Sequence, residues 1–412
     1  MTTLDLHDAL AALSALDGSL MAGTNPEGGY VAYLDFSETV SLAANAPDAG
    51  LAKLTAPVPP TGLSFSGWVG FFGYEFLAAH AGIELKAERD LSVPDGFFAR
   101  PQTILRLGDG RVEIESSLPG REGELATLLA DPPALPGGHS IPAEITCNLS
   151  FEEYAKIFAI VREAILDGET YQIKVSQRHE ARVGIDPVDA FRRLHASNPS
   201  PEAFLVRLPE FAIVSCSPET VIEKQGDRIL TRPIGGTYER ETEANEREII
   251  SRFLADPKEV AEHNMLVDLE RNDLSAVCEP GSVRIARFRE VETYAHLFHL
   301  VSTIEGRLRS GTNLSSILRA MLPGGTITGC PKVRTIELID SLEPCFRGPY
   351  TGSFGTLGDD GSLHLNLIIR ALLALEDRCF VQTGGGIVID STPEYEYNEN
   401  ALKARALLDL LR

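Results

Sequence analysis

Apolar residues in the middle of the chain follow a helical spacing with a clear beginning and end. Ser150 and Glu153 match a capping box, the serine and glutamate pair that closes the first turn of a helix. From Phe151 onward, apolar residues recur every three or four positions until Gly168. This segment is therefore predicted to be an amphipathic helix that stops at the glycine.

A strand is predicted directly after this helix, at residues 171–175. Side chains at alternate positions of a strand share a face of the sheet. Gln172 and Lys174 should therefore point toward the same side.

The other patterned segments mix the two spacings without a regular strand–helix–strand repeat. Short β-like runs lie at 29–36, 67–72, 211–215 and 363–373, and helical patterns lie in an Ala-rich opening and at 244–254, 258–271 and 313–322. This mixture does not favour a doubly wound parallel sheet and predicts a mixed fold of the α+β class. A stretch rich in Pro and Gly at 131–142 predicts a division into residues 1–142 and 143–412.

The charge balance narrows the class of protein. The 412 residues include 37 Lys and Arg against 59 Asp and Glu, a formal net charge of -22, which disfavours binding to nucleic acid or to an anionic membrane. The opening residues lack the regions of a secretory signal, and no apolar run reaches about 18 residues. The six cysteines form no Cys-x-x-Cys pair, which argues against a zinc or disulfide framework. A cytoplasmic enzyme is expected.

Acidic side chains near the C-terminus are candidates for chemistry. If a helix begins at Pro393, then Glu396, Glu399 and Lys403 lie on one stripe of it. Spacing alone is more typical of a solvated, salt-bridged face. Glu262 on another predicted helix is a second acidic candidate, and two carboxylates with retained waters are a common way to hold Mg²⁺.

Four segments combine glycines with polar residues. They lie at 214–220 (VSCSPET), 231–237 (TRPIGGT), 323–334 (PGGTITGCPKVR) and 382–389 (QTGGGIVI). Glycine lets backbone amides approach an anion closely, although each segment alone is more typical of a tight turn.

Four ordered motifs resemble the chorismate-utilising enzymes, in particular component I of aminodeoxychorismate synthase and of anthranilate synthase. The motifs are EHNMLVDLERNDL (262–274), HLVSTIEG (299–306), PGGTITGCPKVR (323–334) and GGGIVIDSTPEYEYNENALKA (384–404). The resemblance runs through residues 145–410, with a weaker echo in GWVGFFGYEF (67–76). It implies an antiparallel β-sandwich core surrounded by helices, with chorismate and Mg²⁺ bound between the sheets.

The resemblance also implies roles for individual residues. Glu262 and Glu399 match the Mg²⁺ ligands, and the metal would bridge to the ring carboxylate of the substrate. Glu219 and His299 match acid–base residues, with Glu219 placed to protonate the departing 4-hydroxyl group, which requires a raised pKa. Thr326 lines the site with these catalytic residues. The positions that match residues holding or lining the substrate are Gln172, Thr237, Tyr350, Arg370, Gly384, Gly385, Gly386 and Lys403.

One position separates the reactions of this family. Isochorismate and salicylate synthases carry a water-activating Lys where this chain has Gln172, so the resemblance favours an aminating member. Residues 384–388, Thr328 and residues 342–344 resemble aminodeoxychorismate synthase more than anthranilate synthase, and the Leu-Leu-Glu-Ser element of the tryptophan feedback site is missing. Amination at C4 to 4-amino-4-deoxychorismate is the favoured reaction, and that of anthranilate synthase component I is the alternative.

Residues 233–237 depart from the pattern of the favoured family. Many aminodeoxychorismate synthases have Pro-Ile-Lys-Gly-Thr there, with a Lys proposed to add to the substrate ring, and anthranilate synthases have Ala in its place. This chain has Gly235, which favours the alternative reaction. One hypothesis is that Lys174 supplies the missing amine, reaching into the space left by Gly235. An equally open interpretation is that Lys174 only pairs with a carboxylate.

The expected partners follow from features that the sequence lacks. No Gly-x-Cys-x-Gly nucleophile turn with a downstream His and Glu is visible, so ammonia would come from a separate glutamine amidotransferase subunit. An aminodeoxychorismate lyase would then complete 4-aminobenzoate synthesis for folate. Cys330 replaces the Ala usual in its motif and is expected to be a packing residue. A non-catalytic chorismate-binding protein is a third hypothesis.

Overall fold

The computed structural model describes residues 6–25, 28–108, 110–133, 144–239, 246–293 and 297–411. The helices are α1 (Leu6–Ser14), α2 (Pro47–Leu54), α3 (Tyr74–His80), α4 (Arg121–Ala130), α5 (Phe151–Leu166), α6 (Pro187–Ser197), α7 (Glu246–Ala255), α8 (Pro257–Ser275), α9 (Leu314–Met321), α10 (Gly325–Thr328), α11 (Lys332–Leu342) and α12 (Pro393–Leu408), followed by a short 3-10 helix (Asp409–Leu411).

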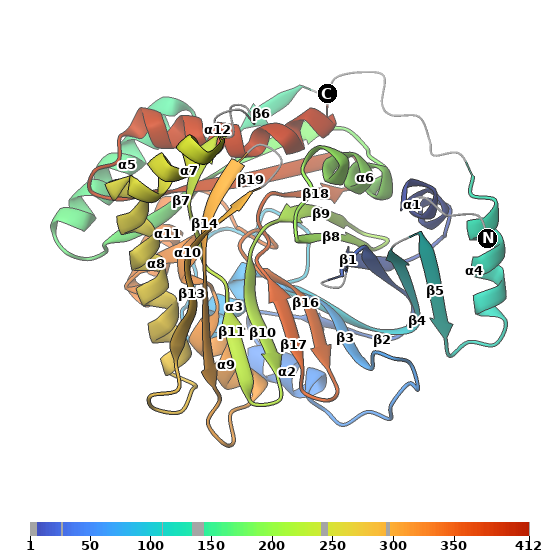
Figure 1. Ribbon diagram of the computed structural model, residues 1–412. Helices are drawn as coiled ribbons and strands as arrows, with labels where there is room; N and C mark the ends of the chain where they lie inside the picture. The colour runs from blue at the N-terminus through green and yellow to red at the C-terminus, as the bar shows by residue number, and fades with distance from the viewer. Residues whose placement is uncertain are drawn as a thin grey trace.

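Strands fill the centre of the molecule, and helices lie around them (Figure 1). The strands are β1 (Leu20–Thr24), β2 (Tyr30–Leu42), β3 (Gly67–Phe72), β4 (Gly96–Gly108), β5 (Arg111–Ser116), β6 (Ile145–Cys147), β7 (Gln172–Arg182), β8 (Glu202–Arg207), β9 (Ala212–Ser217), β10 (Thr220–Gln225), β11 (Arg228–Thr231), β12 (Ile234–Glu239), β13 (Arg284–Thr293), β14 (Leu297–Arg307), β15 (Gly329–Cys330), β16 (Ser353–Gly358), β17 (Leu363–Asn366), β18 (Ala371–Leu375) and β19 (Arg378–Ile387). Every pairing between these described strands is antiparallel. The predicted α+β class with an antiparallel β core is confirmed.

Strands from the first part of the chain pair with strands from the second part. β1 pairs with β8, and β3 pairs with β16 along its whole length. The stretch at which a division of the chain is predicted lies mostly outside the described residues, which resume at Glu144. On either side of that gap, the two parts therefore share one network of hydrogen-bonded strands.

The capped helix of the sequence prediction is confirmed as α5. The Ser150 side chain accepts the backbone N–H of Glu153, and the Glu153 side chain accepts the N–H of Ser150. The strand that follows, β7, begins at Gln172 as expected but continues to Arg182, beyond the predicted end. Polar residues such as Gln177 are buried there, because β7 is an interior strand that pairs with β19 on one edge and with β6 and β15 on the other.

The run at 363–373, predicted as one strand, is interrupted. It forms β17 and β18, and the four residues between them lead the chain away from β10 and β16 toward β9 and β19. Arg370 ends this bend with φ of 48°, a left-handed conformation that non-glycine residues adopt only where surrounding structure holds them. The interruption places Arg370 in the cleft described below.

The remaining predicted elements are present, but their ends differ, most of all for β2, which continues to Leu42 beyond its predicted end at 36. β2, β3, β9, α7, α8 and α9 match the segments at 29–36, 67–72, 211–215, 244–254, 258–271 and 313–322, and the first two residues of the α7 prediction lie outside the described part. β13 was not predicted, because arginines interrupt its apolar alternation and most of its side chains are exposed. Within the described ranges, no helix has the length and apolar character that crossing a membrane requires.

Two helices position the candidate site. α12 packs along β19, and α8 packs against β12 and β14. In Figure 1, α12 crosses the top of the strands and α8 descends along their left side. The first turns of both helices approach the same region, where the strands leave a cleft.

Candidate active site

A cleft enclosing about 1150 Å³, part of it open to solvent, lies between α8, α12 and the strands β7, β12, β14 and β19. Its size is sufficient for a small ring compound with ions and water. The predicted site residues that line it are Gln172, Lys174, Glu219, Glu262, His299, Thr326, Tyr350, Arg370, Gly384, Gly386, Glu399 and Lys403. Of the remaining two, Gly385 packs behind the cleft, and the side chain of Thr237 lies outside the described part of the structure.

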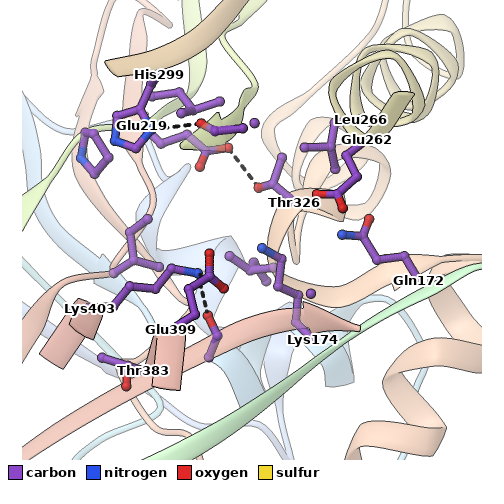
Figure 2. Close-up of a pocket in the computed structure, with 18 of the residues that line it drawn as sticks. Gln172, Lys174, Glu219, Glu262, Leu266, His299, Thr326, Thr383, Glu399 and Lys403 are labelled. Atoms are coloured by element: carbon purple, nitrogen blue, oxygen red, sulfur yellow. Dashed lines mark hydrogen bonds and ion pairs between the residues drawn. The ribbon is translucent and has the colours of Figure 1, made fainter. Parts of the chain in front are cut away.

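Carboxylates from both helices face the cleft. Glu259 and Glu262 come from α8, and Glu396 and Glu399 come from α12 (Figure 2 labels Glu262 and Glu399). The stripe predicted along α12 therefore faces the cleft, and its interpretation as a solvated surface is wrong. Four acidic side chains that meet in one partly enclosed space repel one another unless cations join them.

Burial and neighbouring charges act differently on the two carboxyls expected to bind metal. Burial and the negative charges of Glu259 and Glu399 raise the pKa of Glu262, against the opposing effect of Lys258. Burial also acts against ionisation of Glu399, but Lys403, with Nζ 3.0 Å from Glu399 Oε2, together with Lys174 and Lys258 outweighs burial and lowers the pKa of Glu399. Glu262 is thus the carboxylate with the greater need for an additional cation.

Close packing explains the three consecutive glycines of β19. A Cβ on Gly385 would lie 2.9 Å from Oε2 of Glu396 and 3.2 Å from Oε2 of Glu399. A Cβ on Gly386 would lie 2.5 Å from Nε2 of Gln172. Without side chains, β19 lets α12 and β7 bring their polar groups close to its backbone.

Gln172 and Lys174 rise from β7 into the cleft on the same side, as the strand prediction requires (Figure 2). Burial and the positive charge of Lys403 lower the pKa of Lys174, although Glu399 and other carboxylates counteract this shift. A buried ammonium with a lowered pKa releases its proton more readily than an exposed lysine. The amine of Lys174 is thus available in neutral form at lower pH than usual.

The expected space beside Gly235 is filled. A Cβ on Gly235 would lie 2.8 Å from Cδ1 of Leu266 and 3.1 Å from Nδ1 of His263. Lys174 therefore has no vacant pocket at Gly235 to enter, and its amine faces the open cleft instead.

Glu219 has the environment that a proton donor needs. Burial raises its pKa to about 7, and the Thr326 hydroxyl donates a hydrogen bond of 2.8 Å to Glu219 Oε1. Both residues line the cleft (Figure 2). Near neutral pH, Glu219 can therefore carry a proton and deliver it to a group bound in front of it.

His299 is a neutral imidazole in this arrangement. Arg370 Nη2 lies 3.0 Å from His299 Nε2, and because a guanidinium only donates, Nε2 accepts. Nδ1 then carries the proton and donates it to the Gly236 carbonyl at 3.1 Å. Burial and the charge of Arg370 lower the pKa of His299 to about 3. Both ring nitrogens of His299 are thus engaged, and a pKa this low makes the imidazole a weak base, so the arrangement suits His299 to holding Arg370 rather than to the acid–base role that the resemblance implies.

A buried arginine behind the cleft supports its wall. Arg347 Nε and Nη2 donate to both carboxylate oxygens of Glu343, at 2.7 and 2.6 Å, and Nη2 also donates to the backbone carbonyl of Lys174 at 3.0 Å. Glu75, from α3, accepts the backbone N–H groups of Arg347 and Gly348 at 2.9 and 3.0 Å. The first part of the chain therefore helps to hold the backbone beneath Lys174.

The oxygen-rich side of the cleft fits a hard divalent cation. No ready-made group of three His, Cys, Asp or Glu ligands is present among the described residues. Mg²⁺, however, is commonly held by one or two carboxylates, with water and substrate oxygens completing the shell. Asn400 Oδ1 is buried without a hydrogen-bond partner. It lies beside the Glu396 carboxylate, since a Cβ added to Gly385 would be 2.9 Å from each of these oxygens. Glu262 and Glu399 are the residues that would hold the cation.

Sequence reasoning missed several lining residues. Lys258 and Glu259 line the cleft but lie just before the motif that begins at Glu262. Tyr395 also lines the cleft, and it lies within the motif at 384–404, for which the resemblance implies no role at this position. The spacing of Glu259 and Glu262, three residues apart on one helix, was the available signal for a second acidic stripe.

Comparisons with known proteins agree with this geometry. The family model described as chorismate binding enzyme matches residues 23–409. The chain is 46% identical to an anthranilate synthase component 1 of Haloarcula marismortui over 63% of this chain and 53% of that protein, so the match spans about half of that relative's length. It is 34% identical to aminodeoxychorismate synthase component 1 of Bacillus subtilis, over 83% of this chain and 76% of that protein.

A solved structure of a relative has a similar fold. Anthranilate synthase component I from Streptococcus pneumoniae superimposes with a TM-score of 0.82 at 27% sequence identity, and the match covers 94% of this chain and 93% of that one. Together with the match over residues 23–409, this likeness shows that the chain belongs to the family of chorismate binding enzymes.

Proposed function

We propose that this protein aminates chorismate, using ammonia and Mg²⁺. The single observation that supports this most is the meeting, in one cleft, of a protonatable buried Glu219, the cations Lys174 and Lys403, and the carboxylates Glu262 and Glu399. Chorismate is a dianion that loses a hydroxyl group when it is aminated. Such a substrate needs positive charge at its carboxylates and a proton donor at its leaving oxygen.

The residues divide these tasks. Mg²⁺, held by Glu262 and Glu399, would supply positive charge at the ring carboxylate of chorismate. Arg370 and Lys403, which both line the cleft, would bind the carboxylates of chorismate. Glu219 would donate its proton to the 4-hydroxyl oxygen, which then leaves as water. Gln172 stands where isochorismate and salicylate synthases have a water-activating Lys, and an amide cannot activate water as a base.

Two products are open to this site. C4 amination to 4-amino-4-deoxychorismate is favoured by the sequence features at 342–344 and 384–388 and by the likeness to the Bacillus relative. Gly235 and the names of the Haloarcula and Streptococcus relatives favour anthranilate formation at C2. C4 amination is our first candidate, and the anthranilate synthase component I reaction is the second.

One assay separates the candidates. The full chain is incubated with chorismate, Mg²⁺ and ammonium, with and without an added aminodeoxychorismate lyase. A C4-aminating enzyme gives 4-aminobenzoate only when the lyase is present, whereas an anthranilate synthase gives anthranilate without it. No product in either arm would indicate a non-catalytic chorismate-binding protein. A glutamine amidotransferase subunit should allow glutamine to replace ammonium.

Substitutions of Lys174 test the hypothesis that its amine adds covalently to the ring of chorismate. Replacing Lys174 with Met should reduce the amination rate at least about a hundredfold if its amine adds to the ring, because the methionine side chain carries no amine that can form that bond. Lys174→Arg is the matched control, since Arg keeps the positive charge but is a very weak nucleophile. Steady-state rates with saturating ammonium measure both. If Lys174→Arg restores the rate, Lys174 binds a carboxylate and the nucleophile hypothesis is wrong.

A further inference from the structure

Each carboxylate proposed to hold Mg²⁺ faces a lysine of its own helix, but the two pairs differ. Lys403 Nζ lies 3.0 Å from Glu399 Oε2, a close ion pair in which both side chains are mostly shielded. Lys258, the second residue of α8, lies 3.8 Å from Glu262 Oε1, and its side chain is 41% exposed. A pair this long and this exposed is held weakly and separates easily.

Lys258 also reaches the opposite helix. Its Nζ lies 4.7 Å from the centre of the Tyr395 ring, which belongs to the first turn of α12. Both residues line the cleft. A cation over an aromatic face is attracted to it, so in this one position the ammonium is shared between the Tyr395 ring and the Glu262 carboxylate.

A divalent cation bound at Glu262 would weaken the contact of the Lys258 ammonium with Glu262 and leave its contact with the Tyr395 ring. The ammonium and the metal ion carry the same sign of charge, and within a few ångströms they repel each other strongly in a partly buried site. The other charged groups around Lys258 are Glu259, on its own helix, and Glu396 and Glu399, on α12. All three are carboxylates, and none of them removes the repulsion between the ammonium and the metal ion.

We propose that Lys258 is an internal substitute for the divalent cation: its ammonium balances part of the charge of Glu262 while the metal is absent, and metal binding displaces it from Glu262 while the Tyr395 ring continues to hold it. This inference rests on the proposed metal site at Glu262 and Glu399. It makes Lys258 a positioning residue that sets the affinity for metal, and it couples metal binding to a contact between α8 and α12 across the mouth of the cleft.

Titration of the full-length protein with Mn²⁺ in the absence of chorismate tests the proposal, with free Mn²⁺ followed by electron paramagnetic resonance. Lys258→Met removes the competing charge and should tighten binding roughly three- to tenfold, the range expected for loss of a weak ion pair next to a doubly charged ion. Lys258→Arg keeps the charge and should bind Mn²⁺ within about twofold of wild type.

Tyr395 provides the second arm. Tyr395→Leu removes the aromatic face that holds the ammonium once the metal has displaced it from Glu262, and should weaken Mn²⁺ binding roughly two- to fivefold, whereas Tyr395→Phe, which keeps the ring, should not. In the Lys258→Met background, Tyr395→Leu should have no effect, because no ammonium remains to be moved.

These titrations distinguish a failure of the role proposed for Lys258 from a failure of the metal site proposed at Glu262 and Glu399. If Lys258→Met binds Mn²⁺ no more tightly than wild type while Glu262→Gln abolishes binding, the metal site stands and the role of Lys258 is overturned. If wild type does not bind Mn²⁺, or Glu262→Gln binds it normally, both proposals are overturned. Additive effects of Lys258→Met and Tyr395→Leu would also contradict the proposed movement.

Discussion

Replacing Glu219 with Gln should lower the turnover number for chorismate amination by about a thousandfold, within the range of 10² to 10⁴ usual for loss of a general acid. Gln has nearly the same shape and can still accept the hydrogen bond that Thr326 donates to Glu219 Oε1. It cannot supply a proton to the departing hydroxyl group. The KM for chorismate should therefore change little, and steady-state kinetics at saturating ammonium measure both constants.

The pH dependence of kcat/KM for chorismate checks whether Glu219 is the proton donor. Glu219 is active when protonated, and burial raises its pKa to about 7. In wild type, kcat/KM for chorismate should therefore be constant on the acid side of pH 7 and fall about tenfold per pH unit above it. Because the hydrogen bond from Thr326 lowers this pKa, Thr326→Val should move the fall to higher pH. A Glu219→Gln variant that keeps the wild-type rate would show that another group donates the proton.

Replacing Arg347 with Met should destabilise the folded protein by about 3–5 kcal/mol, the range found when one partner of a buried ion pair is removed. The side chains of Arg347 and Glu343 are only 2% and 3% exposed. Without the guanidinium, the carboxylate of Glu343 stays buried with little beyond the backbone N–H of Ser176, at 2.8 Å, to stabilise it. Chemical denaturation at neutral pH measures the free energy of unfolding.

A double variant is the control for this effect. Arg347→Met combined with Glu343→Leu removes both charges and should recover much of the lost stability, because the unpaired charge causes the larger part of the penalty. It should not recover full activity, since the hydrogen bond from Arg347 to the carbonyl of Lys174 is also lost. Equal destabilisation of the single and double variants would indicate that packing around Arg347, and not charge, is what matters.

The sequence predicts the local features of this fold well. The helix from Phe151 has its own start signal, and the common face of Gln172 and Lys174 follows from strand geometry. The motif residues Glu262 and Glu399 meet at one cleft although 136 intervening residues separate them. That convergence was predictable only through the family resemblance, because spacing on separate helices carries no information about how the helices pack.

The features that escaped prediction depend on long-range contacts. The bend at Arg370 arises because β17 and β18 pair with different neighbours, which no local pattern reveals. The hydrogen bond that occupies Nε2 of His299 comes from Arg370 at the end of that bend. The placement of Leu266 against Gly235, which removes the expected space, is a packing detail of the same kind.

The contact between Glu75 and the backbone of Arg347 and Gly348 has a consequence for protein engineering. None of the described residues before Gln172 lines the cleft, yet Glu75 of α3 holds the backbone of Arg347, which in turn donates to the carbonyl of Lys174. A chimera that joins the first third of a relative to the remainder of this chain would therefore keep this support only if the relative supplies a carboxylate at the position of Glu75. Exchanges between relatives need to preserve this contact even though Glu75 itself does not line the cleft.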